Sequence, residues 1–566
     1  MTRISRHPGE RTPEAAGTRL AGLAVLPLLL GLLFFAASLT PSLIPRPWLL
    51  QGVLAGLVTA IGYMIGQLAL SAWRAVELPR LSGRVARIAH AVIAVPVLAL
   101  LIWTLVHAAG WQDSIRSRFG LEPVEDFGTA AIIAVAIAVF LACFALGWAI
   151  QKLFDVIRHR LYRVMPMRTA NVLGLVLAVS IVFVVTRDGV VQRGFGLAET
   201  SYATAQELFA DAPPAPTDER LPGSPASHVD WGAMGQPGRN FVLDGPDAEA
   251  ISAFTGRPAM TPIRVYVGRA QAEDPTARAE IALKELQRLG AFDRKILIVA
   301  SPTGTGWLDP GGHEPLEIMH DGDIATVAVQ YSYLQSPLAL IFETQYGLDQ
   351  ATATLRVIYE HWKSLPPDAR PRFYLHGISL GAWSSMYSLD IYRVINDPID
   401  GAFWTGPPFP SQLWRRAVAA RNPGSPYVLP EVGTGALVRF ASQFGGIDRS
   451  TGAWGKLRVA FLQYASDAIV FYEPASLWRA PEWMREPRAP DVSPEIRFIP
   501  VVTQLQLALD MALALGVPSG FGHNYAARDY IDPWVAVTDP AGWDEAASAR
   551  LKTWCSDEWG LGCRKR

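Results

Sequence analysis

Long apolar runs separated by short polar loops dominate the first third of the chain. Five of them are about as long as the roughly 20 residues that a helix needs to cross a bilayer. They cover residues 20–39, 49–72, 88–110, 127–150 and 170–186. Five such runs in succession would leave a soluble bundle without a polar face, so the pattern predicts membrane-spanning helices. The first run, preceded by four arginines, also fits a secretory signal, and four spans would follow it in either case.

Basic residues in the polar loops predict the orientation of these helices. Residues 1–19, 73–87 and 151–169 are rich in arginine, whereas residues 40–48 and 111–126 are not. Because Lys and Arg concentrate in cytoplasmic loops, we expect the amino-terminal tail and the basic loops to be cytoplasmic. With five spans, everything that follows them would lie outside the cytoplasm. A count that is wrong by one span would reverse this side.

Four glycines recur along the second predicted span. They are Gly52, Gly56, Gly62 and Gly66. Small residues at such spacing let helices approach closely, and we interpret them as packing sites inside one bundle rather than as a dimer interface. No predicted span carries an acid or a lysine at its centre. A transport pathway usually needs such groups, so the pattern favours a membrane anchor over a transporter.

A stretch rich in proline and small polar residues, 210–227, follows the membrane half. This composition predicts a linker, which we place at residues 188–228. The globular half beyond it contains Cys555 and Cys563, close together near the carboxyl end. A disulfide between them would suit an oxidising compartment, while free thiols or a metal site are alternatives. Two cysteines alone make a poor zinc site, so we expect no metal.

In the globular half, short apolar runs alternate with segments of helical periodicity. Strand candidates lie at residues 241–243, 263–267, 296–300, 325–330, 373–375, 401–404, 459–464 and 498–502. Helix candidates lie at residues 277–289, 351–365, 384–389 and 501–515. This alternation predicts an open, mostly parallel sheet with helices on both faces. In such sheets the functional residues gather at the carboxyl ends of the strands.

One strand candidate runs into a helix candidate through Gly377-Ile378-Ser379-Leu380-Gly381. A serine in this G-x-S-x-G pattern stands on a turn so sharp that only glycine clears the flanking backbone. The turn exposes the hydroxyl above the sheet and directs the Leu380 amide toward a developing oxyanion. The pattern therefore predicts that Ser379 is a nucleophile. The alternative is a small residue at a tight strand–helix junction.

An acid and a histidine follow Ser379 in the chain order that α/β-hydrolases use. Asp467 follows the strand candidate 459–464, and His523 lies in a glycine-rich loop after the last long helix. His523 would take the proton of Ser379 during attack and return it to the leaving group. Asp467 would fix the histidine tautomer and stabilise the imidazolium. As alternatives, Asp467 only caps a helix, or His523 is a loop histidine bonded to a carbonyl.

Several other residues compete for the roles of base and acid. The rival bases are His313, His320, His361 and His376, and the rival acids are Asp390 and Asp400. All four histidines precede Ser379, which breaks the expected order, and the last of them is close enough to support the turn instead. Neither rival acid has the position after a strand that Asp467 has.

The second oxyanion donor is expected on the loop after an earlier strand. Thr303 and Gly304 are the candidates, because a glycine-rich loop lets backbone amides approach a substrate closely; an ordinary loop is the alternative. A long insert at about residues 406–455 could cover the serine and provide an apolar acyl pocket, or it could simply pack on the surface. The candidate pocket residues are Trp404, Phe409 and Trp414.

The sequence resembles a bacterial family of membrane-anchored α/β-hydrolases, whose members carry a multi-span region before a serine-hydrolase domain. The matching stretches are SLTPSLIPRPWLLQG (38–52), WGAMGQPGRNFV (231–242), SPTGTGWLDP (301–310), ATVAVQYSYL (325–334), GISLG (377–381) and QYASDAIVF (463–471). The resemblance implies that Ser379, Asp467 and His523 form the family's catalytic triad. Two positions depart from the family's pattern, since Ile378 stands where Glu is common and Ala468 where Pro is usual.

These observations predict an α-helical transmembrane bundle at residues 20–187 followed by an α/β-hydrolase domain at residues 229–566. The formal net charge of −1 gives no reason to expect nucleic acid as a partner. We expect a serine hydrolase in the cytoplasmic membrane, with its catalytic domain outside, that cleaves lipid or other acyl esters without a cofactor. Acyl transfer on the same triad is one alternative. A non-catalytic membrane scaffold or transport-associated protein is the other.

Overall fold

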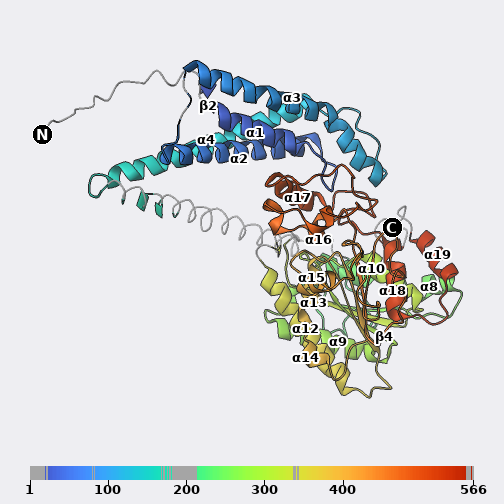
Figure 1. Cartoon of the computed structure of the whole chain (residues 1–566). Coiled ribbons are helices and arrows are strands. Elements are labelled where there is room, and N and C mark those ends of the chain that lie inside the picture. The colour runs from blue at the N-terminus through green and yellow to red at the C-terminus, as the bar shows by residue number, and fades with distance from the viewer. Residues whose placement is uncertain are drawn as a thin grey trace. The chain divides into compact units, whose positions relative to one another are not determined.

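The computed structural model describes residues 19–20, 23–79, 81, 83–166, 169, 173–174, 176–177, 180, 213–334, 339–340, 343–555 and 562–563. The chain divides into two compact units. The helical unit contains Met1–Thr186 and Pro474–Asp510, and the sheet unit contains Arg187–Glu473 and Met511–Arg566. Figure 1 shows the helices and strands of both units, coloured along the chain.

Long apolar helices make up the amino-terminal part of the helical unit. They are α1 (Val25–Ser38), α2 (Trp48–Ala75), α3 (Gly83–Arg116) and α4 (Thr129–Leu161), preceded by the short strands β1 (Arg19–Leu20) and β2 (Leu23–Ala24). Helix α2 packs against both α1 and α4, and α1 also packs against α3 (Figure 1). Leu, Ala and Ile dominate these segments, and such residues form stable helices where no water competes for the backbone.

Three stretches of described helix are long and apolar enough to cross a membrane. They are Trp48–Ala75, Gly83–Phe119 and Thr129–Leu161, which correspond to the second, third and fourth predicted spans. Helix α1 lies in the first predicted span, but its 14 residues extend only about 21 Å, short of a hydrocarbon core of roughly 30 Å. Most of the fifth predicted span, 170–186, lies outside the described residues. The count of five spans therefore stays a prediction.

The glycines predicted to be packing sites lie on two contact faces of α2. They are Gly52 and Gly56, which face α4, and Gly62 and Gly66, which face α1. A Cβ atom on Gly56 would lie 2.6 Å from the Cβ of Val139, and one on Gly66 would lie 2.6 Å from the Cα of Pro27. Because hydrogen occupies those positions instead, α2 can approach both neighbours closely. Packing within one bundle is confirmed.

The helical unit also contains a segment from far along the chain, Pro474–Asp510. It includes two short 3-10 helices, η7 (Pro474–Leu477) and η8 (Glu482–Met484), and most of α17 (Val502–Leu513). The boundary between the two units falls inside α17. The predicted domain 229–566 includes this segment, whereas its contacts group it with the amino-terminal helices.

The sheet unit is built around seven parallel strands in the order β3-β5-β4-β6-β7-β9-β8. The strands are β3 (Ile263–Val267), β4 (Ile296–Ser301), β5 (Ile324–Val329), β6 (Arg372–Ile378), β7 (Gly401–Thr405), β8 (Val438–Ala441) and β9 (Arg458–Leu462). Every residue of β4 and β5 is buried, which explains why their sequences are continuous apolar runs.

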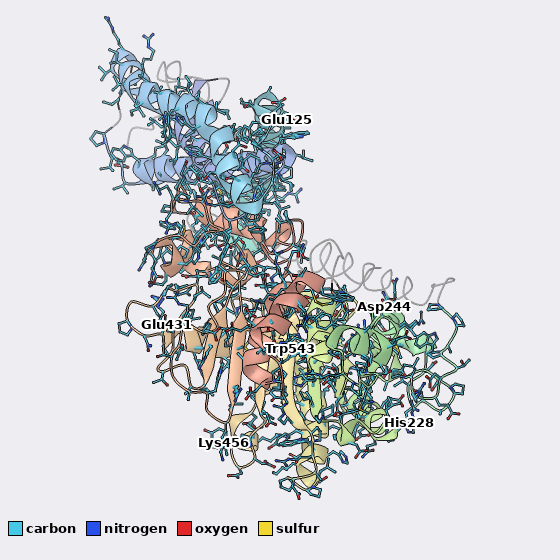
Figure 2. The ribbon with its side chains drawn as sticks, turned by 90° about the vertical axis from the view of Figure 1, so that its right-hand side faces the viewer. Glu125, His228, Asp244, Glu431, Lys456 and Trp543 are labelled. Carbon is cyan, nitrogen blue, oxygen red and sulfur yellow. A yellow bond between two sulfur atoms is a disulfide. The ribbon has the colours of Figure 1, made fainter. Side chains whose placement is uncertain are left out.

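Helices cover both faces of this sheet, as the alternating pattern predicts. They are α7 (Gly235–Leu243), α8 (Ala248–Thr255), α9 (Pro275–Arg288), α10 (Pro310–Met319), α12 (Thr344–Ser364), α13 (Leu380–Ser388), α14 (Ile391–Val394), α15 (Gln412–Ala419), α16 (Ala468–Phe471), α18 (Ile531–Thr538) and α19 (Glu545–Trp554). In β7, Trp404 faces α13 and the preceding Phe403 faces α18, so these two helices lie on opposite faces. Charged side chains such as Lys456, just before β9, lie at the surface (Figure 2).

Two strand candidates are wrong, and one strand of the seven-stranded sheet was missed. Residues 241–243 form the last turn of α7, because an apolar run of three residues fits a buried helix face as well as a strand. Residues 498–502 contain Val501, whose φ of 68° is incompatible with a strand, and they lead into α17. The missed strand is β8, at the edge of the sheet inside the predicted insert 406–455.

Candidate active site

Ser379 lies on the turn that connects β6 to α13. Its backbone has a φ of 56° and a ψ of −127°, which L-residues adopt only under strain. A Cβ atom on Gly377 would lie 2.5 Å from the carbonyl carbon of Gly381, and one on Gly381 would overlap the carbonyl oxygen of Ser301. Both flanking positions therefore require glycine, as a sharp strand–turn–helix corner demands.

The carboxyl end of β7 contacts both the nucleophile candidate and the base candidate. The amide of Ser379 donates to the carbonyl oxygen of Thr405 at 2.9 Å. A Cβ atom on the next residue, Gly406, would lie 2.8 Å from Cε1 of His523. Ser379 and His523 thus contact consecutive residues of one strand end, although their positions in the chain are far apart.

Asp467 follows β9 and is completely buried. Its Oδ2 lies 2.6 Å from Nδ1 of His523, and its Oδ1 accepts the amide of Ile469 at 2.9 Å. The carboxylate therefore caps α16 and contacts the imidazole at the same time, so the capping alternative does not exclude a catalytic role. This contact orients the opposite ring nitrogen, Nε2, as the base of a triad requires.

The loop that carries His523 is fixed by several backbone hydrogen bonds. The amide of His523 donates to the carbonyl of Ala514 at 2.8 Å, and the amide of Gly522 donates to Oγ of Ser466 at 3.0 Å. Nε2 of His523 is buried and forms no hydrogen bond within the part of the chain that the structure describes. Among the described residues, no hydrogen bond therefore joins Ser379 to His523; in enzymes without bound substrate such a bond is often long or poorly aligned.

A tyrosine that the sequence reasoning missed also contacts the acid. The hydroxyl of Tyr525 donates to Oδ2 of Asp467 at 2.7 Å, on the same oxygen that faces His523. Burial raises the pKa of Tyr525 well above its usual value, so the phenol stays protonated and can only donate to the carboxylate. Its ring stacks on Tyr464 with centroids 4.3 Å apart. The only signal in the sequence is its position two residues after His523.

Asp309 is a second buried acid near the site that the sequence reasoning missed. Its carboxylate caps α10 through the amide of Gly311 at 2.9 Å and accepts the hydroxyl of Tyr530 at 2.5 Å. Burial raises the pKa of Asp309 to about 6, although the Tyr530 hydrogen bond acts in the opposite direction. Asp309 thereby fixes the end of the glycine-rich loop that follows β4.

The two predicted oxyanion donors on that loop differ in availability. The amide of Thr303 donates to the carbonyl of Trp307 at 3.0 Å, so it is already engaged. The amides of Gly304 and Leu380 donate no hydrogen bond to any described residue. The turn at residues 377–381, here called the elbow, packs directly on the start of this loop, because Gly381 lies against the carbonyls of Ser301 and Pro302. The geometry therefore favours Gly304 over Thr303 as the partner of Leu380.

Two protein-family profiles match the chain. The profile described as "Alpha/beta-hydrolase family" matches residues 263–551, more than half of the chain. The chain belongs to this α/β-hydrolase family. The profile described as "Alpha/beta-hydrolase family N-terminus" matches residues 39–246, so the family relationship extends over the helical region. No curated protein and no solved structure matches the chain.

In this α/β-hydrolase three of the rival bases and acids, His320, His376 and Asp400, lie in other environments. Nδ1 of His376 lies 2.7 Å from the carbonyl oxygen of Phe403, and burial lowers the pKa of His376 to about 4. Burial also lowers the pKa of His320 to about 3. The carboxylate of Asp400 accepts the amide of Phe373 at 2.7 Å, near the amino end of β6 and thus opposite Ser379.

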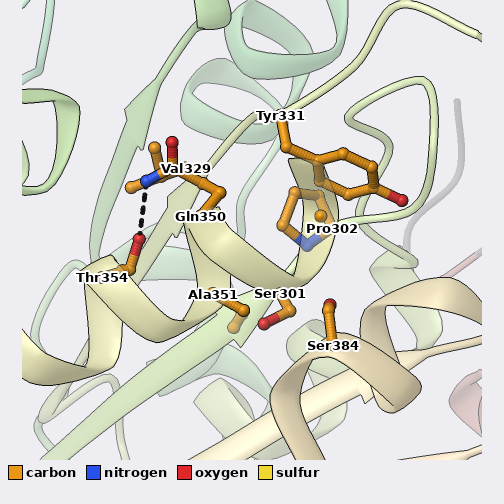
Figure 3. Close-up of a pocket in the computed structure, with 10 residues that line it drawn as sticks. Ser301, Pro302, Val329, Tyr331, Gln350, Ala351, Thr354 and Ser384 are labelled. Carbon is orange, nitrogen blue, oxygen red and sulfur yellow. Dashed lines mark hydrogen bonds between the residues drawn. The ribbon is translucent and has the colours of Figure 1, made fainter. Parts of the chain in front are cut away.

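A small pocket lies beside the elbow of the α/β-hydrolase domain (Figure 3). It is lined by Ala300, Ser301, Pro302, Val329, Tyr331, Gly347, Gln350, Ala351, Thr354 and Ser384. Its volume of about 10 Å³ is close to the space that one water molecule needs, so it cannot hold an acyl chain. Gln350 and Thr354 in its wall are hydrogen-bonded to each other at 3.0 Å.

The aromatic residues predicted to line an acyl pocket occupy different positions. Trp404 is completely buried beneath α13, and its Nε1 donates to Oγ of Ser385 at 3.0 Å. Because its strand position faces the helix layer, Trp404 packs the core, and the structure does not support it as a pocket residue. Trp414 is also buried, with Nε1 donating to Gln463 at 2.7 Å. Phe409 is partly exposed, and its role in a pocket stays a prediction.

Among the described residues, no group of three His, Cys, Asp or Glu side chains could hold a metal ion. Cys555 and Cys563 form a disulfide, which resolves the alternatives left open by the sequence, while Cys143 is a free thiol. The amide of Cys563 also donates to Glu314 in α10 at 2.6 Å.

Proposed function

We propose that this α/β-hydrolase is a membrane-anchored serine hydrolase that cleaves carboxylic esters through an acyl-enzyme on Ser379. The observation that carries the proposal is the 2.6 Å contact between Asp467 Oδ2 and His523 Nδ1, beside a serine on a glycine elbow. This arrangement contains a nucleophile, a base and a group that orients the base, which is what covalent ester cleavage needs.

The first half of the reaction forms the acyl-enzyme. Nε2 of His523 removes the proton of Ser379 as Oγ bonds to the ester carbonyl carbon. The carbonyl oxygen becomes negative and accepts hydrogen bonds from the amides of Leu380 and Gly304. When the tetrahedral intermediate collapses, the bond to the alcohol oxygen breaks and His523 returns the proton to that oxygen. The alcohol then leaves with its proton, and the acyl group remains on Ser379.

The second half releases the acid. His523 removes a proton from water as the water oxygen bonds to the acyl carbon, and the same amides hold the second oxyanion. Collapse breaks the bond to Ser379, which regains the proton from His523. Throughout both halves the ionised carboxylate of Asp467 stabilises the imidazolium without taking its proton.

The helical unit supports a membrane location for this chemistry. Three described helices are long and apolar enough to span a bilayer, and substrates that partition into lipid, such as acyl esters, would be concentrated beside such an anchor. The Cys555–Cys563 disulfide supports placing the catalytic domain on the extracytoplasmic side, because disulfides persist in oxidising compartments. The excess of arginine in alternate loops points to the same side.

A fluorophosphonate probe tests the proposal, because it phosphonylates only an activated serine. Full-length protein in detergent should be labelled at Ser379, and labelling should disappear in Ser379→Ala and fall strongly in His523→Ala. Ser384→Ala, in the helix α13 that follows Ser379, serves as the matched control and should label normally. Absence of labelling at Ser379 in folded wild-type protein would contradict the enzyme proposal. A panel of p-nitrophenyl esters of increasing chain length would then define the acyl preference.

The predicted side is tested separately in intact cells. A protease added outside should cut the carboxyl-terminal half while leaving the amino-terminal tail protected. Protection of the carboxyl-terminal half would show that the domain faces the cytoplasm, without affecting the proposed chemistry.

A further inference from the structure

The motif at residues 38–52, noted in the sequence, has no part in the chemistry proposed above. In the structure it forms the end of α1, the connection to α2 and the start of α2. Within the helical unit, this connection is held by α17. The hydroxyl of Ser42 donates a hydrogen bond to Oδ1 of Asp510 at 2.9 Å. The amide of Leu43 donates one to Oδ2 of Asp510, also at 2.9 Å. Both carboxylate oxygens are thus used by one short loop.

A second residue of α17 extends this contact. Gln506 lies one turn before Asp510, on the same face of the helix. Its Nε2 donates to the carbonyl of Thr40 at 2.9 Å. Two side chains of α17 therefore bind consecutive parts of the loop, and both are buried there.

Arg46 supplies a buried positive charge to the same cluster. It is 6 % exposed, and its guanidinium donates to the carbonyl of Thr40 at 3.0 Å. Its charge also favours the ionised form of Asp510, although burial raises the pKa of Asp510 to about 6. A buried carboxylate with two donors and a nearby cation is a specific contact, because removing either side leaves the other charge without compensation.

The segment that makes this contact is flanked in the chain by two members of the proposed triad. It begins soon after α16, which Asp467 caps. It ends in α17, and Ala514, directly after that helix, accepts the amide of His523 at 2.8 Å. The acid and the base therefore flank, in the chain, a segment whose last residues, in α17, are bound by the amino-terminal helices.

We propose that the loop at residues 39–47 is a docking site for α17. This docking keeps the side chains of Asp467 and His523 in the relative position that catalysis needs. The inference rests on the proposed function, since it concerns the same triad. Asp510 and Ser42 are then positioning residues, which touch no substrate and act through α17. The helical unit has a second role beyond anchoring, because it completes a structural element on which the hydrolase depends.

The test compares full-length variants in detergent with p-nitrophenyl butyrate as substrate. Asp510→Ala removes both contacts and should lower kcat about tenfold or more, because small displacements of a catalytic group are costly. Ser42→Ala removes one hydroxyl, should fold, and should lower kcat about threefold. In both, KM should stay within about twofold of wild type, since no substrate contact is lost. Measurements are made well below each variant's melting temperature.

A matched control distinguishes an effect on the positions of Asp467 and His523 from an effect on overall stability. Asp113→Ala removes a carboxylate of the same unit that accepts a hydrogen bond from the amide of Val124 at 2.7 Å and, among the described residues, forms no hydrogen bond with Ser42, Gln506 or Asp510. It should leave kcat unchanged even if it lowers the melting temperature. Folded Ser42→Ala and Asp510→Ala with wild-type kcat would overturn the inference. If wild-type protein is never labelled at Ser379, the proposed function itself fails, which is a distinguishable result.

Discussion

Nδ1 of His523 lies 2.6 Å from Oδ2 of Asp467, and the two residues reach this contact from separate loops at the carboxyl edge of the sheet. The contact can hold the imidazole in the tautomer whose Nε2 is free to accept a proton. The geometry of the proposed mechanism depends on it more than on any other single contact.

Replacing Asp467 by Asn should therefore abolish most activity. An amide can donate to Nδ1, which favours the wrong tautomer, and it cannot stabilise the imidazolium. We expect kcat to fall about 10³- to 10⁴-fold with little change in KM. Steady-state kinetics on a soluble ester checks this, with the exposed Asp390→Asn as the control. A loss of less than tenfold would show that Asp467 is not the acid.

Tyr525→Phe should weaken catalysis and change its pH dependence. The variant loses the 2.7 Å hydrogen bond to Asp467, which leaves more negative charge on the carboxylate that faces His523. Protonated imidazolium is then favoured, so the acidic limb of the kcat/KM profile should move to higher pH by up to about one unit. We expect kcat to fall about tenfold, since a hydrogen bond to a charged group contributes about 1.5–3 kcal/mol.

Three titratable groups lie near the pair Asp467 and His523. Tyr525 contacts Asp467 directly, Tyr464 stacks on Tyr525, and Asp309 interacts electrostatically with His523. The exposed Tyr392→Phe is the control and should leave the profile unchanged. An unchanged acidic limb in Tyr525→Phe would show that the hydroxyl only fills space.

Gly381→Ala should destabilise the sheet unit strongly. Its Cβ would overlap the carbonyl oxygen of Ser301, and neither backbone segment can move without disturbing the elbow. We expect a loss of at least about 3 kcal/mol in unfolding free energy. Gly516→Ala, whose nearest contact would be an ordinary 3.5 Å, is the control and should change stability little. Thermal unfolding of both variants measures the difference.

Asp309 should make stability depend on pH in the acid range. Its pKa rises from 3.8 to about 6 on folding, chiefly through burial. Below about pH 4 this carboxyl is protonated in both the folded and the unfolded state, and the free energy of unfolding is then highest. As the pH rises to about 6, the unfolded state ionises more easily than the folded state, so the free energy of unfolding falls. The loss is about 3 kcal/mol. Unfolding midpoints of wild type and Asp309→Asn between pH 4 and 7 should converge at low pH and diverge above it, with the variant relatively more stable.

The disulfide gives a prediction that is independent of catalysis. Cys555→Ser should lower the unfolding free energy by about 2–3 kcal/mol, because the cross-link closes a short loop. Thiol titration of the denatured but unreduced chain should find one thiol, Cys143, and reduction should expose three. Three thiols before reduction would show that the pair is open in the native protein.

The elements that the sequence predicted well are those encoded by local patterns. The G-x-S-x-G corner, the buried runs of β4 and β5, and the glycines of α2 each carry their cause within a few neighbouring residues. Ser379 follows β6 and Asp467 follows β9, at the strand ends where the alternation of elements predicts functional residues, whereas His523 follows the helix α17.

What the sequence did not predict depends on contacts between distant residues. Tyr525 reaches Asp467 only because two loops meet, and Trp404 is buried only because its strand position faces α13. Residues 241–243 are too few for their periodicity to distinguish a helix end from a strand. The grouping of Pro474–Asp510 with the amino-terminal helices has no local signature at all.

That grouping has a practical consequence for recombinant production. A shortened chain that starts after the linker would keep α17 but lose Ser42 and Leu43, the donors to Asp510. The orphaned carboxylate and the uncovered side of the helix would face solvent or another molecule. Such a fragment is expected to aggregate or to bind detergent rather than to behave as a soluble monomeric enzyme.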